Sequence, residues 1–128
     1  MLALPLLALL LAAPPLEQSR AEALLASPRP IDKAWGAYLA GNQKLTPLIP
    51  RLIAELDSLR PIPTTAELEN WSLAHTLLDS LIELKAPLSY EQLKPWIDLH
   101  RPEALILLIQ NADNNLQALL ELRPTLIN

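Results

Sequence analysis

Histidine and carboxylate side chains are the groups in this 128-residue sequence that could do acid–base or metal chemistry. We expect His75 to be a hydrogen-bonded histidine in the core or at its boundary, because it falls on an apolar helical row. His100 is followed by Arg101 and Pro102 at a helix joint, and we expect it to be a C-terminal cap that interacts with the helix dipole. Carboxylate pairs such as Glu55 and Asp57 are two residues apart, a spacing that points helical side chains away from each other. We therefore expect no catalytic residue, no metal ligand and no cofactor, and no enzymatic activity.

The composition excludes several other kinds of site. The sequence has no Cys, which removes thiolate nucleophiles, disulfides and zinc sites of the thiolate type. Two Gly residues are too few for a glycine-rich phosphate loop. The net charge of −4 argues against a nucleic-acid surface, which needs clustered Lys and Arg. A protein or peptide partner is the class of ligand that remains.

Aromatic side chains are the best candidates for contacting such a partner. Each lies on or beside the apolar stripe of an expected helix, so core packing is the first interpretation and a partner-binding groove is the alternative. The candidate partner-binding residues are Trp35, Tyr38, Trp71, Tyr90 and Trp96.

The elements that position these residues should be helices. The sequence holds 33 Leu and 13 Pro but no Val and no Phe, a mixture that disfavours strands. Apolar periodicity between proline-containing joints predicts helices over residues 16–26, 31–40, 47–56, 65–85, 90–99, 102–109 and 113–122. The fourth helix carries two apolar rows, so we expect both Leu78 and Leu81 to be buried. Asn111 or Asp113 is expected to cap the last helix.

Three further local signals concern helix ends and bends. Gly41 and Asn42 should end the second helix, because both residue types are common at helix C-termini. Ser89 with Gln92 has the spacing of a capping box at the start of the fifth helix. Pro95 lies inside that helix and should kink it or break its first turn.

The second, fourth and sixth helices are expected to start near Ile31, Thr65 and Pro102, at intervals of 34 and 37 residues. Such periods are typical of α-solenoids. Together, residues 48–56 and, after a loop, residues 73–81 resemble a HEAT repeat. Residues 32–41 are similar to the second helix of a HEAT repeat. The resemblance covers roughly residues 31–122. It implies an all-α fold in which about seven helices form antiparallel pairs, stacked as a short right-handed HEAT-like α-solenoid. It also implies a non-catalytic scaffold that binds a protein or peptide.

The first residues resemble a targeting segment. Residues 1–16 are uncharged, and the Leu/Ala block 2–13 has the length of a signal-peptide apolar region. Residues Ala21-Glu22-Ala23 offer a cleavage site, which divides the chain into a signal peptide over 1–23 and a helical domain over 24–128. We therefore expect export to the periplasm or outside the cell. One alternative is a buried N-terminal helix, and another is an uncut segment that attaches a structural spacer to the membrane. A third is that the chain is the N-terminal helical segment of a larger exported protein.

The last predicted helix lacks a pairing partner. If the first six helices form three pairs, the helix over 113–122 stands alone, and its Leu116, Leu119 and Leu120 are covered on one side only. Terminal repeats normally have a polar outer face. We therefore expect this end to self-associate, or to be followed by further repeats in a longer protein.

Overall fold

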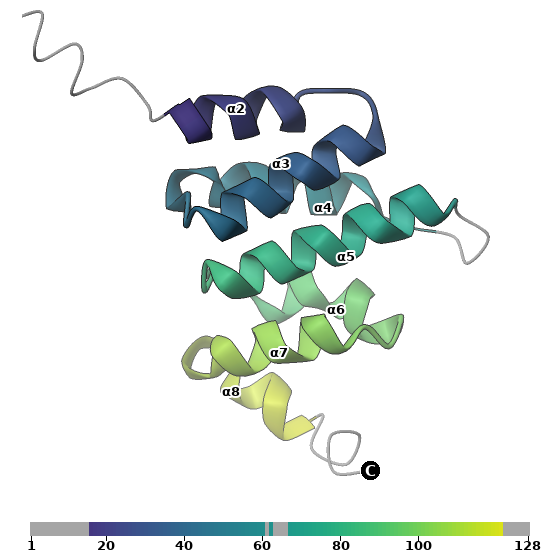
Figure 1. Cartoon of the computed structure of the whole chain (residues 1–128). Helices are drawn as coiled ribbons and strands as arrows, with labels where there is room; N and C mark the ends of the chain where they lie inside the picture. The colour runs from purple at the N-terminus through teal and green to yellow at the C-terminus, as the bar shows by residue number, and fades with distance from the viewer. Residues whose placement is uncertain (1–15, 61, 63–66, 122–128) are drawn as a thin grey trace, which may run out of the picture.

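The computed structural model describes residues 16–60, 62 and 67–121. Over these residues the chain forms seven α-helices and one 3₁₀-helix (η1), and no strand (Figure 1). The expectation of an all-α protein is thereby confirmed. The elements are α2 (Leu16–Leu25), α3 (Pro30–Asn42), η1 (Thr46–Leu48), α4 (Ile49–Ser58), α5 (Leu68–Glu83), α6 (Tyr90–Asp98), α7 (Pro102–Gln110) and α8 (Ala112–Glu121).

Helix α5 connects the two ends of the molecule. It packs against α3 on one side and α7 on the other, and α4 also contacts it. Helix α2 packs on α3, α6 packs on α7, and α8 contacts α7. In Figure 1, α3, α5 and α7 follow one another down the front of the molecule, while α4 and α6 lie behind them. The exposed sides of α3, α5 and α7 therefore form one continuous face.

Leucine and alanine side chains fill the space between the helices. Within α5, Leu77, Leu78 and Leu81 are fully buried. The expected burial of both Leu78 and Leu81 is confirmed, because α5 has neighbours on more than one side. Other members of the row that contains Leu78 lie at the surface instead, since Leu68 is 80% exposed and His75 is also exposed.

Helix α3 approaches its neighbours through small residues. A Cβ atom on Gly36 would lie 3.0 Å from the Ala21 carbonyl oxygen in α2. A Cβ atom on Gly41 would lie 3.0 Å from the Cα atom of Ser80 in α5. The Ser80 hydroxyl donates a hydrogen bond to the carbonyl oxygen of Ala37. Glycine thus sets how closely α3 can lie against α2 and α5.

The expected end of α3 at Gly41 and Asn42 is confirmed, but Gly41 is not the left-handed residue at this end. The helix continues to Asn42, and the left-handed residue after it is Lys44, with φ of 55°. The amide of Leu45 donates to the carbonyl of Ala40, and the amide of Lys44 donates to that of Gly41, which is the Schellman pattern. Gly41 serves the close packing of α3 against α5, so a lysine occupies the left-handed position.

The start of α6 follows the sequence prediction, but its interior does not. Ser89 and Gln92 form the capping box, with the Ser89 side chain accepting from the Gln92 amide. Helical backbone continues through Pro95 from Tyr90 to Asp98. The non-helical residue inside a helix is Asn115 in α8, with φ of −127°.

Two asparagines hold the loop between α5 and α6 against the start of α8. Asn111 Oδ1 accepts from the Leu88 amide at 3.1 Å, and Asn115 Oδ1 accepts from the Tyr90 amide at 2.9 Å. Their Nδ2 atoms donate to the carbonyls of Ala86 and Leu88, respectively, each at 3.1 Å. Loop backbone groups that no helix could pair therefore gain partners from side chains.

The expected targeting segment falls largely outside the described residues, since residues 1–15 are not among them. The expected cleavage site, between Ala23 and Leu24, lies inside α2, and Ala21 and Leu25 of this helix are fully buried. Among the described residues, we find no helix with the length and apolar character that a membrane crossing needs.

Candidate functional site

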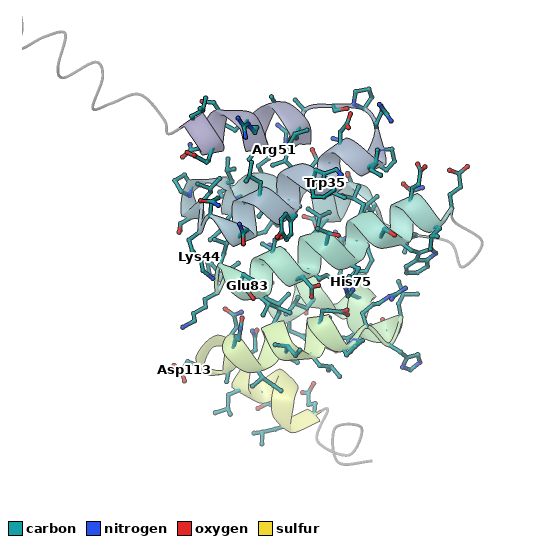
Figure 2. The ribbon with its side chains drawn as sticks, in the orientation of Figure 1. Trp35, Lys44, Arg51, His75, Glu83 and Asp113 are labelled. Carbon is teal, nitrogen blue, oxygen red and sulfur yellow. The ribbon has the colours of Figure 1, made fainter. Side chains whose placement is uncertain are left out.

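The continuous face of α3, α5 and α7 carries a row of ionisable residues along α5. His75, Asp79 and Glu83 follow one another at intervals of four residues, which places them on one side of the helix. All three are exposed. Figure 2 shows His75 and Glu83 on this face, together with Trp35 and Lys44. We call the face formed by the exposed sides of α3, α5 and α7 the front face.

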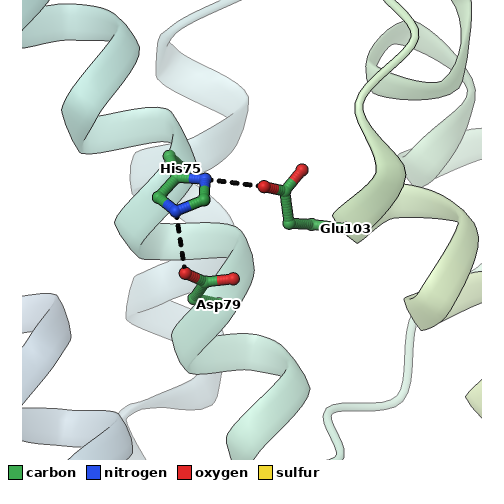
Figure 3. Close-up of side chains that lie close together, drawn as sticks. All are labelled: His75, Asp79 and Glu103. Atoms are coloured by element: carbon green, nitrogen blue, oxygen red, sulfur yellow. Dashed lines mark ion pairs between the residues drawn. The ribbon is translucent and has the colours of Figure 1, made fainter.

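His75 lies between two carboxylates. Its Nε2 atom is 3.0 Å from Asp79 Oδ2 and its Nδ1 atom is 2.6 Å from Glu103 Oε1 (Figure 3). Asp79 is one turn further along α5, whereas Glu103 belongs to the first turn of α7. The cluster of His75, Asp79 and Glu103, hereafter the His75 cluster, therefore connects the two helices.

Glu103 is the buried member of the His75 cluster. The residue is 8% exposed, and its Oε2 atom has no hydrogen-bond partner among the described residues. A buried carboxylate oxygen without a partner carries a desolvation cost. Burial also raises the pKa of Asp79 above its ordinary value; the His75 charge opposes this effect, and the Glu103 and Glu83 carboxylates add to it. The cluster therefore holds more negative charge than His75 alone offsets.

Glu83, at the far end of the row, is paired differently. Lys44 Nζ donates to its Oε2 atom at 2.8 Å and to its backbone carbonyl at 3.1 Å. The hydrogen bond from this ammonium group, followed by its charge, lowers the pKa of Glu83. The left-handed position of Lys44 after α3 brings its side chain to the end of α5.

A groove runs between α3 and α5 on the front face. It has a volume of about 710 Å³ and includes Tyr38, Thr76 and Asp79 in its lining. Trp35 and Tyr38 stand exposed on α3, with ring centroids 5.9 Å apart and ring planes at 89°. We call this groove the α3–α5 groove. The lining residues are Tyr38, Gly41, Asn42, Lys44, Thr76, Asp79, Ser80, Ile82 and Glu83.

A second, more open depression lies beside His75. Its lining includes Trp71 and Arg101, and the Arg101 guanidinium lies 4.3 Å from the centre of the Trp71 ring. This distance is within the range of a cation–π contact. Thr76 lines both this depression and the α3–α5 groove, so the two meet on α5.

The structure separates the five aromatic residues that the sequence suggested. Trp35 and Tyr38 are 60% and 53% exposed and lie together, whereas Trp71 belongs to the depression beside His75. Tyr90 is half-buried against the core. Trp96 is fully buried, and its Nε1 atom has no hydrogen-bond partner among the described residues.

Sequence reasoning treated His75 as a core or boundary residue and overlooked its two carboxylate partners. The spacing of four residues between His75 and Asp79 was a readable signal, because such residues are neighbours on a helix surface. Glu103 offered no such signal, since it is 28 residues away from His75 and reaches it only through the contact of α5 with α7.

Comparison of the chain with protein-family models, with curated proteins and with solved structures finds no match.

Proposed function

We propose that this chain is a non-catalytic binding scaffold of the HEAT-like helical repeat type. The contacts of α2 with α3, α4 with α5 and α6 with α7 support three helix pairs. The second helices of these pairs begin at Pro30, Leu68 and Pro102, so successive starts are 38 and 34 residues apart. Repeat arrays of this kind bind partners along the surface that successive helices share. In this chain that surface is the front face.

The observation that carries the proposal is the exposed aromatic pair beside the α3–α5 groove. Trp35 and Tyr38 keep more than half of their surface in contact with solvent, whereas other large apolar side chains lie in the core. Tryptophan and tyrosine are the residue types that contribute most at protein interfaces. The pair adjoins a groove that could receive a side chain from the partner.

The charges of the groove favour a particular partner. Asp79 and Glu83 line it, and Lys44 is already paired with Glu83. A peptide with an apolar side chain next to Lys or Arg would place the apolar group against Trp35 and Tyr38 and the cation near Asp79. The proposed partner is therefore an apolar and basic segment of another protein.

Selection from a random peptide library against the full-length chain tests this proposal. We expect the selected peptides to combine aromatic or aliphatic residues with Lys or Arg. Fluorescence anisotropy should show at least about tenfold weaker binding to the double variant Trp35→Ala/Tyr38→Ala, because hot-spot truncations cost about 1.4 kcal/mol or more.

The matched control is Leu116→Ala/Leu120→Ala, which removes exposed apolar side chains from α8. It should bind the same peptides as the unmodified protein does. Equal binding by the Trp35→Ala/Tyr38→Ala variant, or loss of binding in the control, would contradict the assignment of the front face.

The cellular location belongs to the same proposal. The Leu/Ala block over residues 2–13 supports export, either after cleavage or with residues 1–16 kept as a membrane tether for a structural spacer. N-terminal sequencing of the mature protein distinguishes these cases. A start near Leu24 supports secretion, and an intact Met1 in the membrane fraction supports the tether; an intact chain in the cytosol would contradict both.

A further inference from the structure

We propose that a proton on His75 regulates the α3–α5 groove, so that the basic partner segment binds more tightly when His75 is neutral. This inference rests on the proposed function, because it concerns the same groove and the same partner. Asp79 connects the two. It lines the groove, where the partner would place its cation, and it also pairs with His75. The imidazole and the partner therefore compete for one carboxylate.

The geometry of the His75 cluster needs two hydrogens on the imidazole ring. Nε2 faces Asp79 Oδ2 at 3.0 Å and Nδ1 faces Glu103 Oε1 at 2.6 Å, so each nitrogen must bring a hydrogen to an ionised carboxylate. A neutral imidazole has one N–H, and its other nitrogen is an acceptor. The arrangement in Figure 3 is therefore that of a protonated His75 between two carboxylates.

Burial decides which contact a neutral His75 keeps. Glu103 is 8% exposed, and its Oε2 atom has no hydrogen-bond partner among the described residues. Loss of the hydrogen at Nδ1 would take the His75 contact from its Oε1 atom as well, at the cost of a buried and unpaired carboxylate. The Asp79 side chain is 51% exposed, so water can replace its contact with His75. The neutral form therefore keeps its N–H on Nδ1 and presents a lone pair at Nε2.

Loss of the proton changes what the groove offers to a cation. Nε2 and Asp79 Oδ2 then face each other as two acceptors, and a Lys or Arg N–H of the partner can take the place of the lost hydrogen. While His75 is protonated, its charge holds Asp79 and repels a second cation. Binding of the basic segment should therefore strengthen as the pH rises and His75 loses its proton.

The other charged groups on the elements around α5 are engaged elsewhere. Arg101, just before α7, lies over the Trp71 ring, and Lys44, after α3, pairs with Glu83. The ionisable groups of α3 and α4 that pair with one another are Lys33, Arg51 and Glu55, and α3 adds the Tyr38 phenol to the groove lining. Among the described residues, His75 is thus the cation that pairs with Asp79 and that the partner has to displace.

Fluorescence anisotropy at about pH 5 and about pH 8 tests the proposal on the full-length chain, because histidine is the residue type that changes charge in this range. The probe is a peptide from the library selection that contains Lys or Arg but no His, Asp or Glu, with its N-terminus acetylated so that the peptide itself does not titrate. We expect at least about fivefold tighter binding at the higher pH, the lower end of typical coupling between two binding events.

Two variants and one matched control assign the effect. His75→Gln should bind the peptide equally at both pH values, and Asp79→Asn should lose the tighter binding at the higher pH. His100→Gln alters the other histidine and should keep the pH dependence of the unmodified chain. Circular dichroism at both pH values checks that each variant remains helical, and should either cluster variant unfold, the other still decides.

The outcomes separate this inference from the proposed function. Binding that Trp35→Ala/Tyr38→Ala weakens, but that does not strengthen with pH in the unmodified chain, would overturn this inference alone. Absence of any selected peptide would overturn both. Burial raises the pKa of Asp79, and its own protonation would act in the same direction. A pH dependence that survives in His75→Gln would therefore assign the effect to Asp79 and overturn the role of His75.

Calorimetry supplies an independent readout. Because coupling between two ligands is reciprocal, the partner's cation must expel the proton from His75. At the pH where the affinity changes most, the heat of binding should therefore differ between buffers of different ionisation enthalpy, as proton release requires. His75→Gln should show no such difference. Equal heats in the unmodified chain, or a difference that persists in His75→Gln, would overturn the proposal.

Discussion

Gly41 and Ser80 mark the closest approach of α3 to α5. A methyl group at position 41 would meet the backbone Cα atom of Ser80 at 3.0 Å, and α5 cannot yield there as a flexible side chain could. Alanine gains about 1 kcal/mol of helix propensity over glycine, but overpacking costs about 1–3 kcal/mol. We expect Gly41→Ala to lower the free energy of unfolding by about 1 kcal/mol or more, as measured by urea denaturation. Asn42→Ala, at the exposed neighbouring position, should not lower it; a stable Gly41→Ala would contradict the packing described.

Asn115 has a buried side chain that forms hydrogen bonds with backbone groups between α5 and α6 and at the start of α6. It accepts from the Tyr90 amide and donates to the Leu88 carbonyl, and the residue is 7% exposed. We expect Asn115→Ala to cost about 1–3 kcal/mol, because both loop groups lose their partner. The control is Gln117→Ala, which removes an exposed side chain from the same helix and should change stability by less than about 0.5 kcal/mol. Hydrogen exchange of the Tyr90 amide should accelerate in Asn115→Ala alone.

At the residue scale, the sequence predicted contacts between residues close together in the chain but not contacts between residues far apart in it. The capping box of Ser89 with Gln92 was predictable because its partners are only three positions apart in the sequence. The bonds of Asn111 and Asn115 to the loop before α6 were not, since they join residues 23–27 positions apart. The same limit applies to His75, whose contact with Glu103 depends on how α5 packs on α7.

At the element scale, three of the helices are followed by a residue other than glycine with a positive φ. Lys44, Lys85 and His100 have φ of 55°, 52° and 59°. His100 lies at the C-terminal end of α6, where the sequence placed it as a cap, and it adopts the left-handed conformation there. A residue with a Cβ atom loses about 1 kcal/mol or more in this conformation.

Replacement of Lys85 by glycine should therefore stabilise the protein. The Ala86 amide donates to the Leu81 carbonyl, and this hydrogen bond does not depend on the lysine side chain. We expect Lys85→Gly to raise the free energy of unfolding by about 0.5–1 kcal/mol. Lys94→Gly, inside α6, should instead lower it by about 1 kcal/mol, since an interior glycine disfavours a helix. In thermal denaturation, the melting temperature of Lys85→Gly should rise and that of Lys94→Gly should fall. A shift in the same direction for both variants would contradict the left-handed conformation of Lys85.

Two of the buried leucines of α5 test whether this helix has a core on more than one side. Leu78 and Leu81 are both fully buried. Truncation of either to alanine should cost about 2–5 kcal/mol, because each leaves a cavity. Leu68→Ala is the control, since Leu68 is 80% exposed and should change stability by less than about 0.5 kcal/mol. A small loss at Leu78 or Leu81 would mean that α5 is covered on one side only.

The bounds of the helices were predictable to within a few residues. The physical reasons for those bounds were harder to predict. Proline placed the starts of α3 and α7 correctly, because it fits the first turn of a helix and breaks the preceding one. The expected helix over 65–85 begins only at Leu68. Pro95 left α6 unbroken, whereas Asn115 bends α8. A periodic pattern of apolar residues contains no information about these cases.

At the scale of the whole molecule, helical composition predicted the fold class but not the front face. Leucine-rich segments separated by prolines favour helices over strands, and the described residues form only helices and the joints between them. Which aromatic residues stay outside depends on how those helices stack. Trp96 and Trp35 both lie on apolar stripes, yet the first is fully buried and the second is 60% exposed.

The exposed side of α8 leads to the last prediction. Leu116 and Leu120 are one turn apart on this helix and are 61% and 54% exposed, which gives the end of the molecule an apolar strip. Because apolar surface avoids water, we expect the chain to self-associate through α8 as its concentration rises. Light scattering should show this association, and the double variant Leu116→Lys/Leu120→Lys should be monomeric. The variant Leu68→Lys, which changes an even more exposed leucine on α5, should still associate. A monomer at every concentration, without binding of a dye for exposed apolar surface, would show that α8 is not an interface.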